Sequence, residues 1–291
     1  MNTLRGMGVA LVTPFKEDLT VDHYALARLV EFNIDHGTDY LVISGTTGES
    51  ATISFEEKKE IIKTVATVNN GRIPLVIGVG GFNTSAIIEE LKSTDLSIFE
   101  AVLSVSPYYS KPTQEGFYQH FKAVAEQCEI PVILYNVPGR TAKNMEPSTT
   151  LRLARDFSNI VAVKEAGNNV QQYLELIKNK PDDFLIISGD DDLALGVTLA
   201  GGSGVISVIG QAFPAEFSKM IHLGLERDAK RSYDIHYKLM DVINLIFKEN
   251  NPAGIKAVLK ELNICESYVR LPLVEASDSH KSEIKEALTK M

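Results

Sequence analysis

Short apolar segments recur along the chain, each followed by a corner rich in Gly, Ser, Thr or Pro and then by a stretch of helical periodicity. The segments are β-branched and almost continuously apolar, which is typical of parallel strands covered on both faces. They begin at Gly8, Tyr40, Ile73, Ala101, Pro131, Ile160, Phe184 and Gly204. Their starts lie about 20–35 residues apart, the length of one strand with its helix. The pattern predicts eight strand–helix units.

The stretches between the apolar segments have the spacing of amphipathic helices, with Leu26, Leu29 and Val30 as the first example. Ser54 and Thr113 stand where helix caps are expected. Eight consecutive units without a break in composition favour an α/β protein built as a (β/α)8 TIM barrel. A doubly wound sheet is the alternative, but it more often has five or six strands.

The strand–helix pattern ends near Leu225, and the rest of the chain is predicted to be helical. An apolar stripe runs through Tyr233, Tyr237, Met240, Ile243 and Phe247. A further helix is predicted to open at Asn251-Pro252, with Asn as the cap and Pro in the first turn, and a last one follows Ser279. We therefore predict a catalytic barrel over residues 1–225 and a C-terminal helical extension over residues 226–291.

Composition and charge narrow the class of protein. The chain has 291 residues, of which 44% are hydrophobic, as in ordinary globular proteins. Its 38 acidic and 29 basic residues give a formal charge of −9, which disfavours nucleic acid or an anionic membrane as a partner. No apolar run approaches the roughly 20 residues of a membrane-spanning helix. We expect a cytoplasmic protein in which Cys128 and Cys265 are buried free thiols.

Lys164 is the most informative single residue, because it ends the sixth predicted strand and active sites of such barrels lie at the C-terminal strand ends. Alternation places Ile160, Ala162 and Lys164 on one strand face. A lysine that faces the barrel interior is desolvated, and this favours the free amine that attacks a ketone. The alternative is a strand-end lysine that reaches solvent or pairs with Glu165.

Hydroxyl groups end the neighbouring strands. Tyr135 closes the fifth strand, and Thr46 and Tyr109 follow the second and fourth. A linked set of hydroxyls could relay the protons that imine formation requires. Tyrosines at strand ends more often serve in packing, with the ring buried and the hydroxyl in water. The proton-relay hypothesis therefore depends on all three hydroxyls lying at the same barrel mouth.

Two groups in the same loops are suited to carboxylates: the Thr46-Thr47-Gly48 turn, through its backbone N–H groups, and Arg140. Asp190, Asp191 and Asp192 are interpreted as helix-cap and helix-dipole residues, and the six histidines lack paired ligand spacing, so no catalytic metal is expected. The glycines at 201–204 fit either a phosphate site or a helix C-cap with a close-packed turn.

Several motifs follow one another in a fixed order: GTTGES (45–50), SPYYSKPTQEGFYQHF (106–121), YNVPGRT (135–141), the strand ending in Lys164, SGDD (188–191), GGSGVISV (201–208), NPAGIKAVL (251–259) and RLPL (270–273). Together they resemble the dihydrodipicolinate synthase family of class I, pyruvate-dependent aldolases, over nearly the whole chain. The resemblance implies condensation of pyruvate with L-aspartate 4-semialdehyde to 4-hydroxy-tetrahydrodipicolinate, in the diaminopimelate route to lysine. It also implies that no metal or organic cofactor takes part.

The resemblance assigns the catalytic roles as well. Lys164 would form the pyruvate imine, and Tyr135, Thr46 and Tyr109 would form the proton relay. Tyr109 is expected to come from the adjacent subunit of a homodimer, which is often paired into a homotetramer.

Substrate-binding roles follow in the same way: Thr47 for the pyruvate carboxylate, Arg140 for the carboxylate of aspartate semialdehyde, and Gly189 and the carbonyl of Ile206 as site lining. One alternative is a pyruvate-dependent aldolase of a 2-keto-3-deoxy sugar acid or of N-acetylneuraminate, which would be indifferent to loss of Arg140. The other is a non-catalytic paralogue, which the complete set of site residues disfavours.

Feedback inhibition by lysine is expected to be weak or absent. Lysine-inhibited members of the family place His, Asn and Glu around a dimer-interface site. The matching positions here are Phe55, Lys58, Phe82 and Ala86, beside Ser50 and Tyr108. Lys58 would add a like charge, and a partner for the ammonium group of the inhibitor would be missing.

Overall fold

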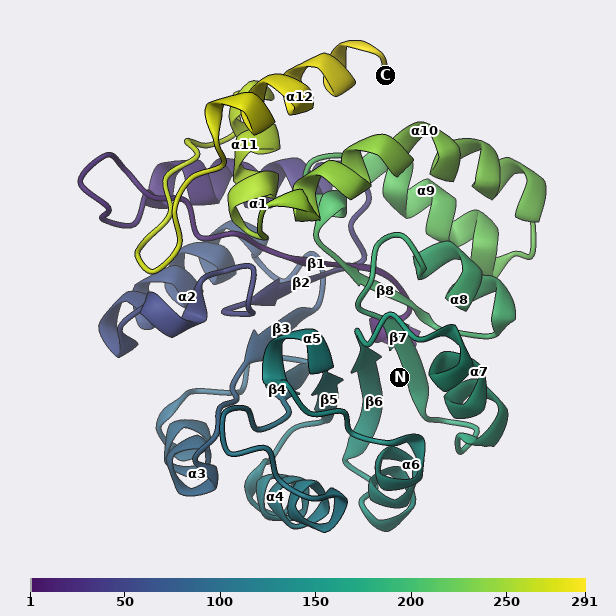
Figure 1. Cartoon of the computed structure of the whole chain (residues 1–291). Coiled ribbons are helices and arrows are strands. Elements are labelled where there is room, and N and C mark those ends of the chain that lie inside the picture. Colours follow the sequence, from purple (N-terminus) through teal and green to yellow (C-terminus); the bar gives the residue numbers. More distant parts are fainter. Residues whose placement is uncertain (1) are drawn as a thin grey trace.

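The computed structural model describes residues 2–291, in which eight parallel strands close into one barrel (Figure 1). Each strand pairs with the next one along the chain, and β8 pairs with β1. The strands are β1 Gly6–Ala10, β2 Tyr40–Ile43, β3 Leu75–Gly78, β4 Ala101–Val105, β5 Val132–Asn136, β6 Ile160–Glu165, β7 Leu185–Ser188 and β8 Gly204–Ser207. The predicted (β/α)8 barrel is confirmed, and the doubly wound alternative is wrong.

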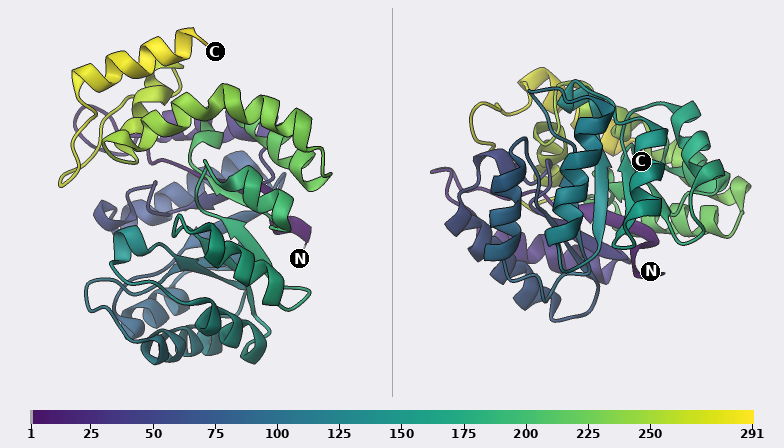
Figure 2. Two further views of the ribbon diagram at one scale, coloured as in Figure 1. Left: turned by 45° about the vertical axis from the view of Figure 1, so that its right-hand side comes forward. Right: turned by 90° about the horizontal axis from the view of Figure 1, so that it is seen from below.

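Helices surround the barrel, and those of the C-terminal extension gather on one side of it (Figures 1 and 2). The barrel helices are α1 His23–Asp35, α2 Phe55–Asn69, α3 Thr84–Ser93, α4 Gln114–Gln127, α5 Pro138–Thr141, α6 Pro147–Asp156, α7 Val170–Asn179, α8 Ala194–Ala200 and α9 Pro214–Leu225. The extension holds α10 Ala229–Lys248, α11 Ala253–Glu261 and α12 Asp278–Thr289. The described residues 2–291 also contain three 3-10 turns: η1 Asn2–Leu4, η2 Ser50–Thr52 and η3 Ile209–Gln211.

Local sequence explains most helix starts. Ser54 and Glu57 form a reciprocal capping box at α2, and the Thr113 hydroxyl accepts the N–H of Gly116 at α4. The cap predicted at Asn251 is wrong, because Pro252 is the N-cap of α11 and the Asn251 side chain turns toward the barrel mouth. Gly201 is the C-cap of α8, which agrees with the interpretation of residues 201–204 as a helix C-cap with a close-packed turn.

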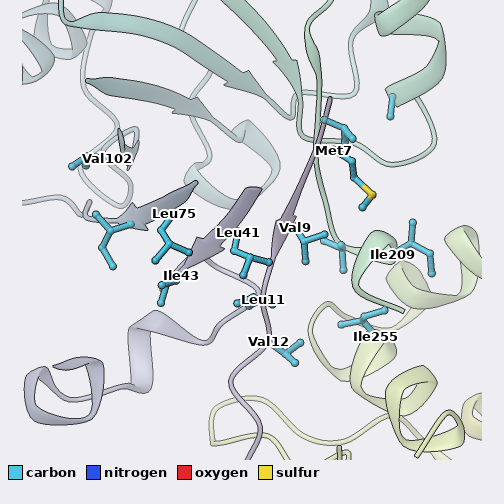
Figure 3. Packing of buried hydrophobic residues seen from close by; sticks show 14 of the residues in the cluster. Met7, Val9, Leu11, Val12, Leu41, Ile43, Leu75, Val102, Ile209 and Ile255 are labelled. Carbon is cyan, nitrogen blue, oxygen red and sulfur yellow. The ribbon is translucent and has the colours of Figure 1, made fainter. Parts of the chain in front are cut away.

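The core has two layers. One fills the barrel interior, with Val42, Val76, Leu103, Ile133 and Ile187 among its members. The other lies between the strands and the helices, and Figure 3 shows members of it from β1 and β2 together with Ile209 and Ile255. Ile255 belongs to α11, so the extension covers the outside of the barrel as part of one continuous outer core.

β6 departs from simple alternation at its start. The register against β5 passes from Ile160 directly to Ala162, which leaves Val161 as an extra residue. Ile160 consequently packs in the outer core and Val161 in the inner one, opposite to the prediction from alternation. Ala162 remains in the inner core below Lys164, so the irregularity leaves the catalytic end of the strand in the predicted phase.

The seam between β1 and β8 depends on two glycines. Gly6 and Gly204 pair in register and have φ angles of +95° and +127°, which disfavour other residues. A Cβ atom at Gly204 would lie 1.9 Å from the Gly6 carbonyl oxygen. The close approach of the two strands requires that residue 204 have no side chain, and a Cβ atom at Gly6 would instead lie 2.1 Å from Oδ2 of Asp39.

The extension continues directly from the barrel. α9 ends at Leu225, and α10 packs against α8 and α9. The division into two parts at residue 225 stays a prediction. Within residues 2–291, no helix has the length and apolarity that crossing a membrane requires.

Candidate functional site

A cavity of about 230 Å³ opens at the C-terminal ends of the strands. It brings together six of the eight predicted site residues: Thr46, Thr47, Tyr135, Arg140, Lys164 and Gly189. They come from four different strand ends or the loops after them, so closure of the barrel is what gathers them.

Lys164 lies inside this cavity with 5% of its surface exposed. Its Nζ is 4.5 Å from the centre of the Tyr135 ring, and the two residues are register partners on β6 and β5. Among residues 2–291, the buried Lys256 forms an ion pair, but Lys164 forms none. The alternative pairing with Glu165 is wrong, because the Glu165 carboxylate accepts hydrogen bonds from Asn136 and Gln172 instead.

Gly189 provides room for the lysine. A Cβ atom there would lie 2.9 Å from Cε of Lys164 and 2.6 Å from Cβ of Ala166. The Gly189 N–H also donates to the carbonyl of Glu165 at 2.6 Å. The absence of a side chain at 189 therefore lets β7 approach the lysine closely.

Asp190 and Asp191 do not cap a helix, contrary to the prediction, since α8 begins only at Ala194 and has Leu193 as its N-cap. The chain first folds back over the strand ends, where Asp191 is 1% exposed and accepts the N–H groups of Val208 and Ile209 at 3.1 and 2.8 Å. Burial raises the pKa of Asp191 to about 6 and also raises the pKa of Asp190, and the charge of Lys164 opposes both shifts.

The two predicted carboxylate-binding groups share Asn251 as a neighbour, although the sequence pattern predicts a helix cap at that residue. The Asn251 side-chain NH₂ donates to Oγ1 of Thr47 at 3.1 Å, and the Asn251 carbonyl accepts from Arg140 at 3.1 Å. Oδ1 of Asn251 is buried and has no hydrogen-bond partner within residues 2–291. The NPAGIKAVL motif was the only signal for Asn251, and its pattern equally fits a helix cap.

A buried ion pair attaches the C-terminal extension to the loop after β2, which carries Thr46 and Thr47. Lys256 of α11 is 0% exposed, and its Nζ donates to Oε1 of Glu49 at 2.6 Å and to the Tyr268 carbonyl at 2.7 Å. The other Glu49 oxygen accepts the N–H of Arg270 at 3.0 Å. Because Glu49 directly follows the 46–48 turn, the extension holds the loop that carries Thr46 and Thr47.

The remaining two predicted residues lie elsewhere. Ile206 is fully buried in the inner core at the end of β8. Tyr109 is 90% exposed, has a φ of +66° and does not line the cavity. One chain by itself therefore gathers Lys164, Tyr135 and Thr46 but not the third hydroxyl of the predicted relay.

A larger cavity of about 560 Å³ adjoins the first and shares Thr46, Tyr135 and Arg140 with it. Its wall includes Lys58, whose Nζ donates to the Gly78 carbonyl at 2.7 Å and to Oε1 of Glu90 at 2.6 Å. The ammonium group of Lys58 is thus held in place by the protein itself.

The chemistry available in the smaller cavity is that of an amine, a phenol and groups for carboxylates. An unpaired lysine amine can add to a ketone, and a neighbouring phenol can exchange the protons of that addition. Within residues 2–291, no three His, Cys, Asp or Glu side chains are grouped in a way that could hold a metal ion. The arrangement suits imine chemistry on a small keto acid.

Comparison with known proteins gives a consistent result. The family model described as "Dihydrodipicolinate synthetase family" matches residues 3–291. The 4-hydroxy-tetrahydrodipicolinate synthase of Flavobacterium psychrophilum is 58% identical over 278 residues, covering 96% of this chain and 95% of its own.

Solved structures agree with the sequence comparison. The dihydrodipicolinate synthase of Aquifex aeolicus superposes with a TM-score of 0.95 at 40% identity, over 99% of this chain and 98% of that chain. A structure titled as the first monomeric dihydrodipicolinate synthase variant superposes with a TM-score of 0.96 at 35% identity, over 99% and 97% of the two chains.

Proposed function

Because this chain belongs to the dihydrodipicolinate synthetase family, we propose that it condenses pyruvate with L-aspartate 4-semialdehyde to give 4-hydroxy-tetrahydrodipicolinate. The product would enter the diaminopimelate route to lysine. The observation that carries the proposal is the unpaired, buried Lys164 in a cavity that also contains Tyr135 and Arg140.

The first half of the proposed reaction forms an imine. Nζ of Lys164 attacks the pyruvate ketone, and the resulting carbinolamine loses water to form a protonated imine. Tyr135 is suited to pass protons during these steps because its ring lies against the lysine. The 46–48 turn would hold the pyruvate carboxylate, with the Thr47 hydroxyl kept in place by Asn251.

The second half forms the carbon–carbon bond and releases the lysine. Loss of a methyl proton converts the imine to an enamine, whose carbon attacks the aldehyde of the second substrate. The amine of that substrate then attacks the imine carbon, closes the ring and displaces Nζ of Lys164. Arg140 would bind the carboxylate of the semialdehyde. The lysine supplies the covalent chemistry, so the proposed reaction uses no metal or organic cofactor.

Trapping and turnover together test this function. Borohydride reduction in the presence of pyruvate should leave a 1-carboxyethyl group on Nζ of Lys164, located by mass spectrometry. Turnover should then occur with pyruvate plus aspartate semialdehyde and fail with a panel of 2-keto-3-deoxy sugar acids and N-acetylneuraminate. Cleavage of a sugar acid without the condensation would contradict the proposal. Absence of any adduct would contradict every imine mechanism, as expected of a non-catalytic paralogue.

We propose further that the active form is a homodimer, or a homotetramer made of two dimers. Support comes from Tyr109, which is 90% exposed in the single chain, and from the neighbouring aromatic pair of Phe82 and Tyr108, whose ring centres are 5.1 Å apart. A tyrosine acting in the partner's site would need this exposure.

Mixing two inactive variants tests the shared site. Tyr109→Phe and Lys164→Ala should each be nearly inactive, and hybrids formed by co-refolding should regain part of the activity, since each hybrid dimer contains one complete site. Sedimentation would give the size of the assembly. An active monomer would contradict the proposal.

We infer a cytoplasmic location for the same enzyme. Cys128 and Cys265 are both free and buried, and they would remain reduced in that compartment. Fractionation of cells that produce the chain should recover the activity with cytoplasmic markers, and recovery with secreted or membrane markers would contradict the inference.

A further inference from the structure

The outer faces of β5 and β6 carry a polar pair directly behind the proposed reaction centre. Tyr135 and Lys164 are register partners that face the cavity, and Asn136 and Glu165 are the next partners along the same two strands. Successive strand residues point to opposite faces, so this second pair lies between the barrel and its helices. Both Asn136 and Glu165 are 0% exposed.

The contacts of this pair form a closed network. Nδ2 of Asn136 donates to both carboxylate oxygens of Glu165, at 3.0 and 2.9 Å. Gln172 of α7 donates to the same carboxylate at 2.8 Å. Oδ1 of Asn136 accepts the N–H of Met145 at 2.9 Å, and Nδ2 also reaches Oδ1 of Asn144 at 2.8 Å. Every side-chain contact of Glu165 is therefore with a donor, and only an acceptor fits at that position.

The surroundings of Glu165 contain no compensating cation among residues 2–291. The loop after β5 presents the uncharged Asn144 and Met145, and α7 presents Gln172 and Tyr173, whose hydroxyl donates to the Glu165 carbonyl. Asp190 is the nearby charge from the β7 end, and Lys164, the preceding residue on β6, points to the opposite strand face. Burial, helped by Asp190, raises the pKa of Glu165 to about 7.

A buried carboxylate without a cation is costly, and here amide donors alone stabilise it. The network therefore connects the last residues of β5 and β6 at one fixed spacing. Reaction rates depend steeply on such spacing, since a displacement of about 1 Å can lower a rate by about 10²-fold.

We propose that Glu165 and Asn136 are positioning residues, whose hydrogen-bonded pair behind β5 and β6 sets the relation between Tyr135 and Lys164 in the cavity. The inference rests on the proposed function, because it assumes that those two residues form and protonate the imine. It adds that the ionised form of Glu165 is the competent one, since a protonated carboxyl would present a hydrogen to the donors of Asn136 and Gln172.

Variants that exchange donor and acceptor test the proposal. Glu165→Gln should lower the single-turnover rate of imine formation by about 10–100-fold, with the Km for pyruvate changed by less than about 3-fold, because the 46–48 turn is not touched. Asn136→Asp should lower the rate further, since it places two carboxylates face to face. The double variant Asn136→Asp with Glu165→Gln restores one donor facing one acceptor and should recover most of the rate.

The pH profile separates positioning from a general loss of structure. The ratio of the wild-type rate to the Glu165→Gln rate should be high above pH 7 and fall toward one below it, as Glu165 becomes protonated in the wild type. If Glu165→Gln fails to fold, Gln172→Met removes one donor to the carboxylate and should lower the rate by several-fold.

Some outcomes would overturn the proposal. They are a Glu165→Gln variant with the wild-type rate, a rate ratio independent of pH, and a double variant that regains thermal stability but not rate. Wild-type trapping on Lys164 is measured alongside. If the wild type forms no pyruvate adduct, the proposed function itself fails; if it does and only the variants disagree, the positioning inference alone fails.

Discussion

Two lysines of this protein are almost equally hidden from solvent, and their surroundings differ completely. Lys164, in the cavity at the barrel mouth, is 5% exposed and lies against an aromatic ring without an ion-pair partner among residues 2–291. Lys256, in the extension, is 0% exposed and is held by Glu49, by the Tyr268 carbonyl and by the ring of Phe15 at 4.2 Å.

Burial by itself thus does not separate a reactive amine from a structural one. A paired ammonium group resists loss of its proton, because neutralisation would leave the carboxylate without its partner. Burial lowers the pKa of Lys256, and Glu49 opposes that shift. Lys164 has no ion-pair partner among residues 2–291, so addition of its amine to a ketone would break no ion pair. The two sites differ most in the carboxylate of Glu49, which pairs with Lys256 and has no counterpart at Lys164.

Substitution of Lys164 gives the largest expected effect on activity. Lys164→Met should lower kcat by on the order of 10³-fold or more, because no other amine can form the imine. Its free energy of unfolding should stay within about 1 kcal/mol of the wild-type value, since no ion pair is broken. Turnover assays and urea denaturation at fixed protein concentration measure the two quantities. A strongly destabilised Lys164→Met would show that the lysine is structural after all.

The opposite result is expected at Lys256. Lys256→Met should lower the free energy of unfolding by about 3–5 kcal/mol, because it leaves Glu49 buried without its partner. Glu49→Gln in the same chain should restore most of the loss, and urea denaturation of the single and double variants checks this. Pyruvate should still be trapped on Lys164 in every variant that folds. Loss of trapping in a stable double variant would contradict the separation of the two roles.

Arg140 offers a smaller and more selective effect. Arg140→Ala should lower kcat/Km for aspartate semialdehyde by about 10–100-fold, the range for losing a hydrogen bond to a charged group. The rate of pyruvate trapping should change by less than about 2-fold, because the arginine contacts Asn251 and not Lys164. Steady-state kinetics with each substrate varied in turn distinguish the two. An equal decrease of kcat/Km for both substrates would contradict the assignment of Arg140 to aspartate semialdehyde.

The last prediction concerns Lys58, and it is that free lysine has no effect on the condensation rate. Lys58 is paired with Glu90 and bonded to the Gly78 carbonyl in the wall of the larger cavity. Glu90 in the same wall is already paired with Lys58 and is not free to bind the ammonium group of lysine, so lysine at sub-millimolar concentration should leave the condensation rate unchanged. A coupled assay with a lysine titration is sufficient. Inhibition in that range would show that the cavity accepts an ammonium group in spite of Lys58.

The sequence was most informative where a structure is determined by residues close together in the chain. Each apolar strand carries its pattern locally, and the cap at Ser54 is formed within four residues, so the barrel and its helix starts were predictable. The gathering of Thr46, Tyr135 and Lys164 also followed, because the barrel places all C-terminal strand ends together.

The contacts that the sequence did not predict are those between a buried polar or charged group and a partner far away in the sequence. Glu49 and Lys256 are 207 positions apart, and no local pattern marks them as partners. The same holds for Asp191, whose partners are backbone N–H groups of the β8 loop, and for Asn251, whose helix-cap pattern concealed its contact with Thr47. The extra residue at Val161 similarly depends on register against β5, which is a property of two strands.

The glycine seam between β1 and β8 has a consequence for folding kinetics. Gly6 and Gly204 stand near opposite ends of the barrel sequence, so their pairing closes a very long loop. Non-local pairing of this kind forms slowly, because chain entropy is lost before the contact is gained. During synthesis, β1 emerges long before its partner and exposes an unpaired edge until β8 follows. We expect closure of this seam to be a late step, and the partly closed barrel to be the species most prone to aggregate.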